Sequence, residues 1–167
     1  MLQRIQSVFM FFAAASMVAM LFFPLWEKSD SNPDEALREY AIMDAFTLRY
    51  ERHNTETGEV ELLGTQNTIL LSIGAILSAG VMLFSISRFK NRLTQVKLNA
   101  LFSLLVAGVL GGTYYYITKA NALFDVNIQG IILVGFYFPV VAMFNNFLAN
   151  RFIRKDEKLV RSADRIR

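Results

Sequence analysis

The sequence predicts an all-α integral membrane protein: a bundle of four transmembrane helices, with a small loop subdomain outside the cytoplasm and a basic C-terminal helix inside it. The main observation is that four stretches of about 20 residues contain no charged side chain and no histidine. A helix of that length crosses the ~30 Å of bilayer hydrocarbon. A second observation is that charge is sorted between the connecting segments. The predicted spans are residues 7–26, 68–87, 98–117 and 130–149.

The charge pattern also predicts which side of the membrane each connection occupies. Residues 27–67 contain ten acidic and four basic side chains, whereas residues 88–97 contain four bases and no acid. Residues 150–167 contain seven bases and three acids. Lys and Arg near span ends are retained in the cytoplasm. We therefore expect a multi-pass protein with both termini and residues 88–97 in the cytoplasm and residues 27–67 outside it.

The long acidic connection is predicted to form a short helix followed by a β-hairpin. Asn32 and Pro33, followed by two acids, are typical of a helix start, and the helix would continue past Tyr40 for about three turns. Residues 46–52 and 59–62 alternate apolar and polar side chains on either side of a turn-forming segment. This pattern is typical of a hairpin.

The basic tail is predicted to continue the fourth helix as an amphipathic helix. Its apolar residues recur near helical spacing, and bases occupy the remaining positions. Three partners are considered: anionic lipid, a cytoplasmic protein, and nucleic acid. Nucleic acid is not expected, because Phe152 is the one aromatic residue that accompanies the charges. The predicted basic helix residues are Arg151, Arg154, Lys155, Lys158, Arg161 and Arg165.

Small residues recur in the second and third predicted spans and indicate close helix packing. In lipid, helices associate through van der Waals contact, which small residues permit. One interpretation is internal packing of the second helix against the third. The alternative is a face open to a partner subunit. The residues assigned to this packing or partner interface are Gly74, Ser78, Ala79, Gly108, Gly111 and Gly112.

Three asparagines lie near the cytoplasmic ends of the third and fourth predicted spans, namely Asn99, Asn145 and Asn146. An amide at membrane depth needs partners, and an interhelical hydrogen bond there contributes ~0.6–2 kcal/mol. We interpret the three as an interhelical polar clamp. A functional polar pocket is the alternative.

The residue inventory argues against catalysis. The chain has no cysteine and a single histidine, His53, which disfavours thiolate chemistry and multi-histidine metal or haem sites. Proton relays and intramembrane acid–base catalysis use buried ionisable groups, and the predicted spans contain none. We predict no enzyme activity, no cofactor and no metal. The predicted function is a non-catalytic accessory or scaffold subunit of an envelope membrane complex, and the alternative is a component of an oligomeric transporter or channel.

Three segments resemble a family of small bacterial four-span inner-membrane proteins that is known as a domain of unknown function. They are residues 1–6 (MLQRIQ), 90–99 (KNRLTQVKLN) and 148–165 (LANRFIRKDEKLVRSADR). The resemblance extends over essentially the whole chain and implies a location in the bacterial inner membrane. It carries over no activity and no catalytic residues. A weaker likeness in architecture is to claudin-like tetraspan proteins, whose paired cysteines in the first outer loop are absent here.

Overall fold

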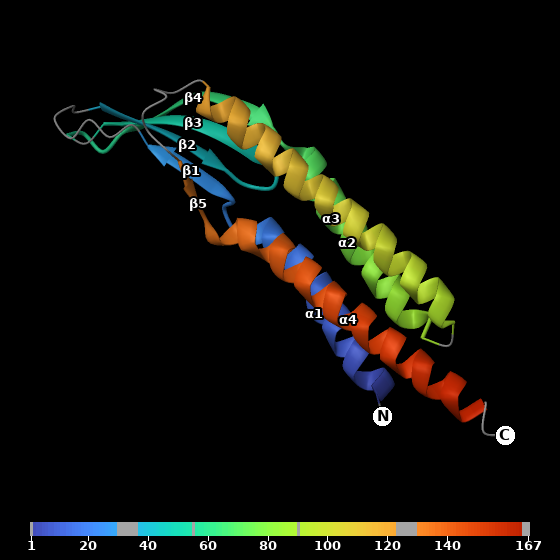
Figure 1. Ribbon diagram of the computed structural model, residues 1–167. Helices are drawn as coiled ribbons and strands as arrows, with labels where there is room; N and C mark the ends of the chain where they lie inside the picture. The colour runs from blue at the N-terminus through green and yellow to red at the C-terminus, as the bar shows by residue number, and fades with distance from the viewer. Residues whose placement is uncertain (1, 30–36, 55, 90, 123–129, 165–167) are drawn as a thin grey trace.

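The computed structural model combines a five-stranded antiparallel sheet with four helices, so the prediction of an all-α protein is wrong. The helices leave the sheet in one direction and run beside one another, and both chain ends lie at the end far from the sheet (Figure 1). The molecule is therefore mixed α/β, and the helices are not a separate four-helix bundle. The structure describes residues 2–29, 37–54, 56–89, 91–122 and 130–164.

The four helices follow the predicted apolar stretches only in part. α2 (Ile69–Ser87) matches the predicted span 68–87 closely. The other helices are α1 (Leu2–Ala19), which continues into the short 3-10 helix η1 (Met20–Phe22), α3 (Arg92–Asn121) and α4 (Val134–Asp164).

Each departure from the predicted spans has a local cause. The first helix stops before Pro24, which cannot continue a helical hydrogen-bond pattern. α3 begins well before the predicted start of its span, because the side chain of Asn91 accepts a hydrogen bond from the backbone N–H of Thr94 and caps the helix. The last predicted span begins with a strand instead of a helix, at Ile131–Ile132.

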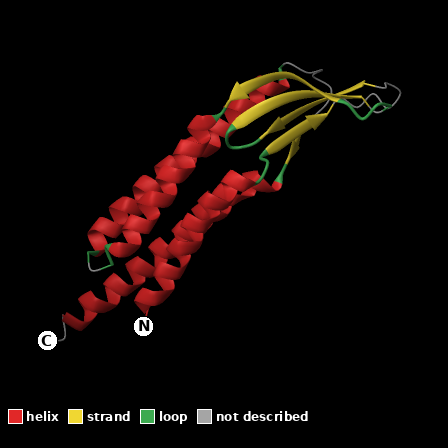
Figure 2. Cartoon of the chain, turned by 180° about the vertical axis from the view of Figure 1, so that it is seen from behind, coloured by secondary structure: helices red, strands yellow, loops and turns green. Residues whose placement is uncertain are grey.

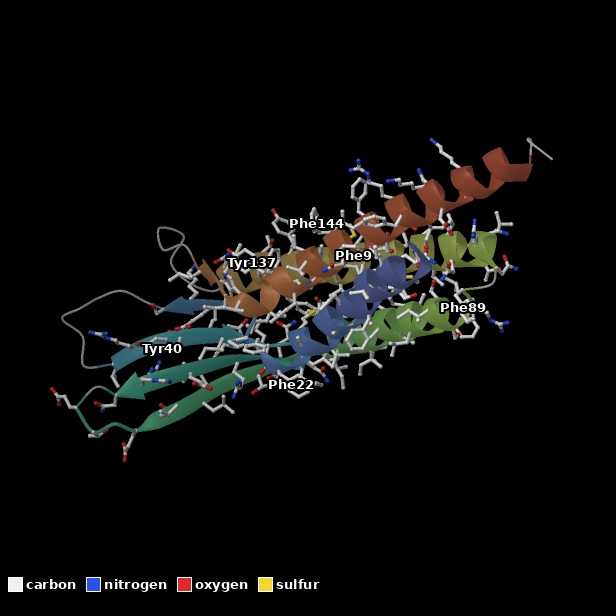
Figure 3. The ribbon with its side chains drawn as sticks, turned by 90° about the horizontal axis from the view of Figure 1, so that it is seen from below. Phe9, Phe22, Tyr40, Phe89, Tyr137 and Phe144 are labelled. Atoms are coloured by element: carbon white, nitrogen blue, oxygen red, sulfur yellow. The ribbon has the colours of Figure 1, made fainter. Side chains whose placement is uncertain are left out.

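Three helices in the described part of the chain are long and apolar enough to cross a membrane, by length and composition. They cover Ile5–Phe22, Ile69–Ser87 and Arg92–Asn121. Figure 3 shows aromatic side chains such as Phe22 and Phe144 projecting from the outside of the helices. Phe22 is 78% exposed and Phe144 is 61% exposed. The outer surface of the helical part is thus strongly apolar.

The helices pack as two neighbouring pairs. α1 lies against α4 and α2 lies against α3, and further contacts join α1 to α2 and α3 to α4. Figure 2 shows the same pairing from behind. The core between them is built from buried methionine and other apolar side chains, including Met10, Met17, Met82, Phe102 and Val106.

The sheet has the strand order β4-β3-β2-β1-β5, with all neighbours antiparallel. β3 and β4 form the predicted hairpin, with His53 opposite Val60 at its closed end and Thr47 opposite Asn67 at the other. A bulge beside Tyr50 shifts the register along the hairpin. The strands are β1 (Trp26–Ser29), β2 (Leu37–Met43), β3 (Thr47–Asn54), β4 (Val60–Asn67) and β5 (Ile131–Ile132).

The short helix predicted after Asn32 is not found where the structure describes the chain. Residues 30–36 lie outside the described residues, and Leu37 and Tyr40, which were expected in the helix, belong to β2. β2 is hydrogen-bonded on both sides, by β1 and β3. Pairing on both sides outweighs a local helix signal, because strand preference depends on neighbouring strands.

One face of the sheet is buried and is tied to the helices. Trp26, Ala41, Met43 and Leu48 are buried on that face and belong to the same core as the helices. The connection before β1 is held at the start of α4, because the backbone N–H of Gly135 donates to the carbonyl of Pro24 at 3.0 Å. A side chain at position 135 would clash with this carbonyl, so the close approach requires glycine.

Candidate functional site

Several of the predicted interface residues line a groove between α2 and α3, which we call the α2–α3 groove. Its volume is 610 Å³. Its surface is mainly apolar, with glycines at its floor and two tyrosines at the end near the sheet. The lining residues are Leu70, Leu71, Gly74, Leu104, Leu105, Gly108, Val109, Gly111, Gly112, Tyr115 and Tyr116.

Two glycines of the predicted interface bring α2 and α3 together. A Cβ atom added at Gly74 would lie 2.7 Å from Cγ2 of Val109. On the opposite helix, a Cβ atom added at Gly112 would lie 2.9 Å from Cδ2 of Leu71. The two glycines thus each receive a side chain from the facing helix. This arrangement corresponds to the internal packing interpretation of the small residues.

Two other glycines of α3 face open space. A Cβ atom added at Gly108 or Gly111 would meet no atom within 4 Å among the described residues, and both positions are exposed. Ser78 and Ala79 of α2 are buried in the protein interior. The predicted interface therefore divides into an internal contact and an open floor of the α2–α3 groove.

Two of the three asparagines assigned to the predicted clamp, Asn99 and Asn146, contact each other between α3 and α4. Nδ2 of Asn146 donates to the backbone carbonyl of Asn99 at 3.0 Å and to Oγ of Ser103 at 2.7 Å. Asn99 and Asn146 are both fully buried. Asn145 is not part of this contact, because its Nδ2 donates to the carbonyl of Val141 within α4 at 2.9 Å.

The polar cluster is larger than the sequence indicated. Nδ2 of Asn99 donates to Oδ1 of Asn150 at 2.9 Å, and Oγ of Ser85 donates to Oδ1 of Asn99 at 2.9 Å. Nε2 of Gln95 donates to the carbonyl of Ser85 at 3.2 Å. The cluster therefore joins α2, α3 and α4. A signal for Gln95 was available, since it lies one helical turn before Asn99 and thus on the same face of α3.

The predicted basic helix is the C-terminal part of α4. Arg151, Arg154, Lys155 and Lys158 are exposed and line a surface depression of 460 Å³ together with Phe147 and Asn150. Arg161 belongs to α4, but its side chain lies outside the described residues, as does Arg165 as a whole. On the other side of the helix, Asp156 forms an ion pair with Arg92 of α3 at 2.8 Å.

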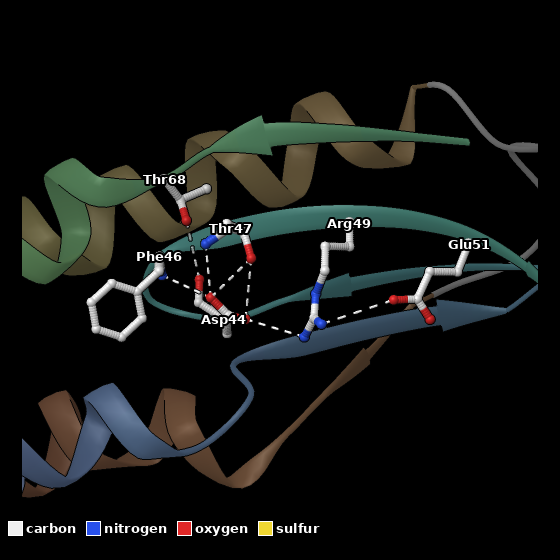
Figure 4. Close-up of polar contacts among 6 residues, drawn as sticks. All are labelled: Asp44, Phe46, Thr47, Arg49, Glu51 and Thr68. Carbon is white, nitrogen blue, oxygen red and sulfur yellow. Dashed lines mark hydrogen bonds and ion pairs between the residues drawn. The ribbon is translucent and has the colours of Figure 1, made fainter. Parts of the chain in front are cut away.

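The junction between the sheet and α2 is organised by Asp44, in the turn between β2 and β3 (Figure 4). Its Oδ1 accepts hydrogen bonds from the backbone N–H groups of Phe46 at 2.8 Å and Thr47 at 2.7 Å. Oγ1 of Thr68, just before α2, donates to the backbone carbonyl of Asp44 at 3.2 Å. Oγ of Ser72 also donates to the carbonyl of Ala45. This junction fixes the turn on the first residues of α2.

Several charged side chains of β2, β3 and β4 form ion pairs with one another. Arg52 contacts Glu39 at 2.7 Å, and its hydrogen bond to Glu39 raises the pKa of the guanidinium. His53 lies 3.1 Å from Glu51, measured from Nε2 to Oε2. Among the described residues, no three side chains of the types His, Cys, Asp and Glu gather as a metal-binding group. The expectations of no catalysis, no cofactor and no metal stay predictions.

A family model described as Domain of unknown function (DUF4293) matches residues 2–166. No curated protein matches the sequence.

Proposed function

We propose that this chain, which belongs to the DUF4293 family of domains of unknown function, is a non-catalytic scaffold subunit embedded in the bacterial inner membrane. Its helical part would lie in the bilayer, and its sheet would lie outside the cytoplasm. The single observation that carries the scaffold role is the α2–α3 groove, which is apolar, open along Gly108 and Gly111, and located within the helical part.

The placement in the membrane is supported by the surface of the helical part. Leu70 is 69% exposed, Leu104 is 70% exposed and Phe147 is 64% exposed. Monomeric soluble proteins rarely expose apolar surface of this extent. In a bilayer, such side chains contact lipid at no cost. Leu70 and Leu104 belong to two of the three helices that are long and apolar enough to cross a membrane, and Phe147 belongs to α4, which packs beside them.

The proposed orientation is supported by the two ends of the molecule. Both chain ends lie opposite the sheet (Figure 1). The exposed bases Arg88, Lys97 and Arg151 are found in the part far from the sheet, which also carries the connection between α2 and α3. The sheet carries acids such as Glu39 and Glu61. Basic residues are retained on the cytoplasmic side, so the sheet end is assigned to the outside.

The occupant proposed for the α2–α3 groove is an apolar transmembrane helix of a partner subunit. The proposed location of the groove limits what can occupy it, because a groove within the bilayer is accessible only to lipid and to other membrane helices. Because Gly108 and Gly111 have no side chain, they leave room for the backbone of another helix to approach closely. Close backbone approach is how helices gain van der Waals contact in lipid.

Site-specific cross-linking in native membranes tests the scaffold role. The chain has no cysteine, so a single cysteine at Leu104, on the rim of the groove, reports on one position. We expect an adduct with one partner protein at Leu104→Cys. The same experiment at Val140→Cys, on the exposed surface of α4, should give no such adduct.

A second variant makes the test specific. Gly108→Leu with Gly111→Leu fills the open floor and should abolish the adduct at position 104, while the protein still folds. Equal adducts at positions 104 and 140, or an adduct that survives filling of the groove, would contradict the proposal. An adduct with the mass of two copies of this chain would favour the alternative function, a component of an oligomeric transporter or channel.

A further inference from the structure

We propose that the C-terminal part of α4 contains a binding site for the phosphate headgroup of an anionic phospholipid, formed by Arg151, Arg154, Lys155 and Lys158. This inference rests on the membrane placement proposed above and adds a ligand class to it. The four side chains line the same depression of 460 Å³, together with Phe147 and Asn150. A depression of this kind gives the charges a common location, which a simple scatter of surface bases would lack.

The charges of the site face outward. Arg151, Arg154, Lys155 and Lys158 are all exposed, and none of them forms an ion pair with a residue that the structure describes. Asp156 is paired with Arg92 of α3 at 2.8 Å, and neither Asp156 nor the adjacent acid Glu157 is among the residues that line the depression. Four positive charges within two turns of one helix therefore remain available to an anion.

The outward face of α4 changes character at the site. Val140, Phe144 and Phe147 are exposed along one side of the helix, and Arg151 and Lys155 continue the same side one turn and two turns later. Arg151 lies 17 residues after Val134, the first residue of α4, which corresponds to about 26 Å along the axis. The bases thus begin where the helix would leave the hydrocarbon.

The continuity of apolar and basic surface identifies the ligand as a lipid. A phospholipid with its acyl chains along Phe144 and Phe147 would bring its phosphate to the level of Arg151 and Arg154. Arginine binds phosphate oxygens through two parallel hydrogen bonds, and lysine adds a point charge. Free phosphate would use the bases but would gain nothing from Phe147.

The test is a titration of detergent-solubilised full-length protein with fluorescent phosphatidylglycerol. The variant Arg151→Gln with Lys155→Gln removes two charges from the site. We expect its dissociation constant to rise about 25-fold, which corresponds to about fivefold for each base near a phosphate. The variant Arg151→Lys with Lys155→Arg keeps the charges and should retain most of the affinity.

The matched control is Arg88→Gln with Lys97→Gln, which removes two exposed charges from the same end of the molecule. We expect its affinity to fall by less than about threefold, since only screened long-range attraction is lost. An equal loss in both variants would mean general electrostatic attraction and would overturn the site. No loss in either variant would do the same.

Two further binding measurements distinguish a lipid headgroup from a soluble phosphate as the ligand. Phosphatidylcholine with the same fluorophore should bind no better to the wild type than to the Arg151→Gln, Lys155→Gln variant. Inorganic phosphate should not displace phosphatidylglycerol at millimolar concentration, and if it does, the site binds a soluble anion and the lipid assignment is wrong. The cross-linking at position 104 does not depend on these bases, so failure of either proposal is recognised separately.

Discussion

Gly74 and Val109 face each other across the contact between α2 and α3, and the Cγ2 atom of Val109 occupies the space that a side chain at position 74 would need. A Cβ atom there would lie 2.7 Å away from it. Val is stiff in a helix, because its branched side chain strongly prefers one rotamer. The distance between the two helices therefore depends on the absence of a side chain at Gly74.

Gly74→Ala should lower the thermal stability of the protein in mild detergent. Overpacking a close contact costs about 1–3 kcal/mol, against a gain of about 1 kcal/mol from the better helix propensity of alanine. Gly80→Ala on the same helix is the control, because its Cβ atom would meet nothing within 4 Å among the described residues. Gly80→Ala should keep or raise the melting temperature. A compensating Val109→Ala change should restore part of the loss, and equal melting temperatures for the two alanine variants would contradict the packing argument.

Asn146→Ala should destabilise the contact between α3 and α4. The variant removes two hydrogen bonds, to the carbonyl of Asn99 and to Oγ of Ser103. Interhelical bonds of this kind contribute about 0.6–2 kcal/mol each in membrane proteins. The adjacent Asn145→Ala removes a bond within α4 alone and should have a smaller effect. Unfolding in a denaturing detergent measures both variants, and a larger loss for Asn145→Ala would show that the clamp is placed wrongly.

Asp44→Ala should loosen the turn that joins the sheet to α2. The carboxylate accepts hydrogen bonds from the backbone N–H groups of Phe46 and Thr47. Loss of these bonds costs about 1–3 kcal/mol. Asp44→Asn retains one acceptor oxygen and should lose less. The backbone bond from Thr68 to the carbonyl at position 44 is the same in both variants. Limited proteolysis at the turn distinguishes them, and equal cleavage of both would indicate that the side-chain oxygen has no role.

The decline in folding stability at alkaline pH should depend on Tyr50. Burial raises the pKa of the Tyr50 hydroxyl above its ordinary value of 10.0. The unfolded chain therefore loses this proton at a lower pH than the folded chain, so the contribution of Tyr50 to stability is complete below pH 10 and declines as the pH rises further. Tyr50→Phe removes this contribution.

Melting temperatures of the wild type and of Tyr50→Phe, measured between pH 8 and about pH 11, test the pH dependence. Below pH 10 the difference between the two proteins should be constant. At higher pH the wild type should lose stability faster than the variant. Parallel curves over the whole range would show that Tyr50 ionises alike in the folded and unfolded chains.

The prediction of the hairpin and that of the neighbouring helix had different outcomes for a physical reason. The hairpin between β3 and β4 is local, since its strands are joined by a short turn, and alternating side chains were enough to indicate it. β2 was predicted as a helix because Asn32 and Pro33 resemble a helix start. Its strand structure depends on two neighbours, β1 and β3, and no pattern within β2 reports their presence.

At the candidate site, the small residues and the asparagines were likewise predicted from the sequence as groups, but the contacts of each residue were decided by the tertiary structure. Composition alone indicated that Gly74 and Gly108 favour close approach in lipid. Which of them is filled by a facing side chain depends on the rotation of each helix about its axis. Gly74 receives Val109, whereas Gly108 stays open. Likewise, Asn145 and Asn146 are neighbours in the sequence, but only Asn146 reaches α3.

The sequence by itself determined which stretches are apolar, how charge is divided between the connecting segments, and that residues 46–62 contain a hairpin. These properties follow from composition and from contacts between residues close in the chain. Only the tertiary structure decided that β1 and β5 complete a sheet, since Trp26 and Ile132 are opposite each other although more than a hundred residues separate them. β5 lies within an apolar run and β1 begins at the end of another, and a strand two to four residues long has too few positions to show a periodicity that distinguishes it from a helix.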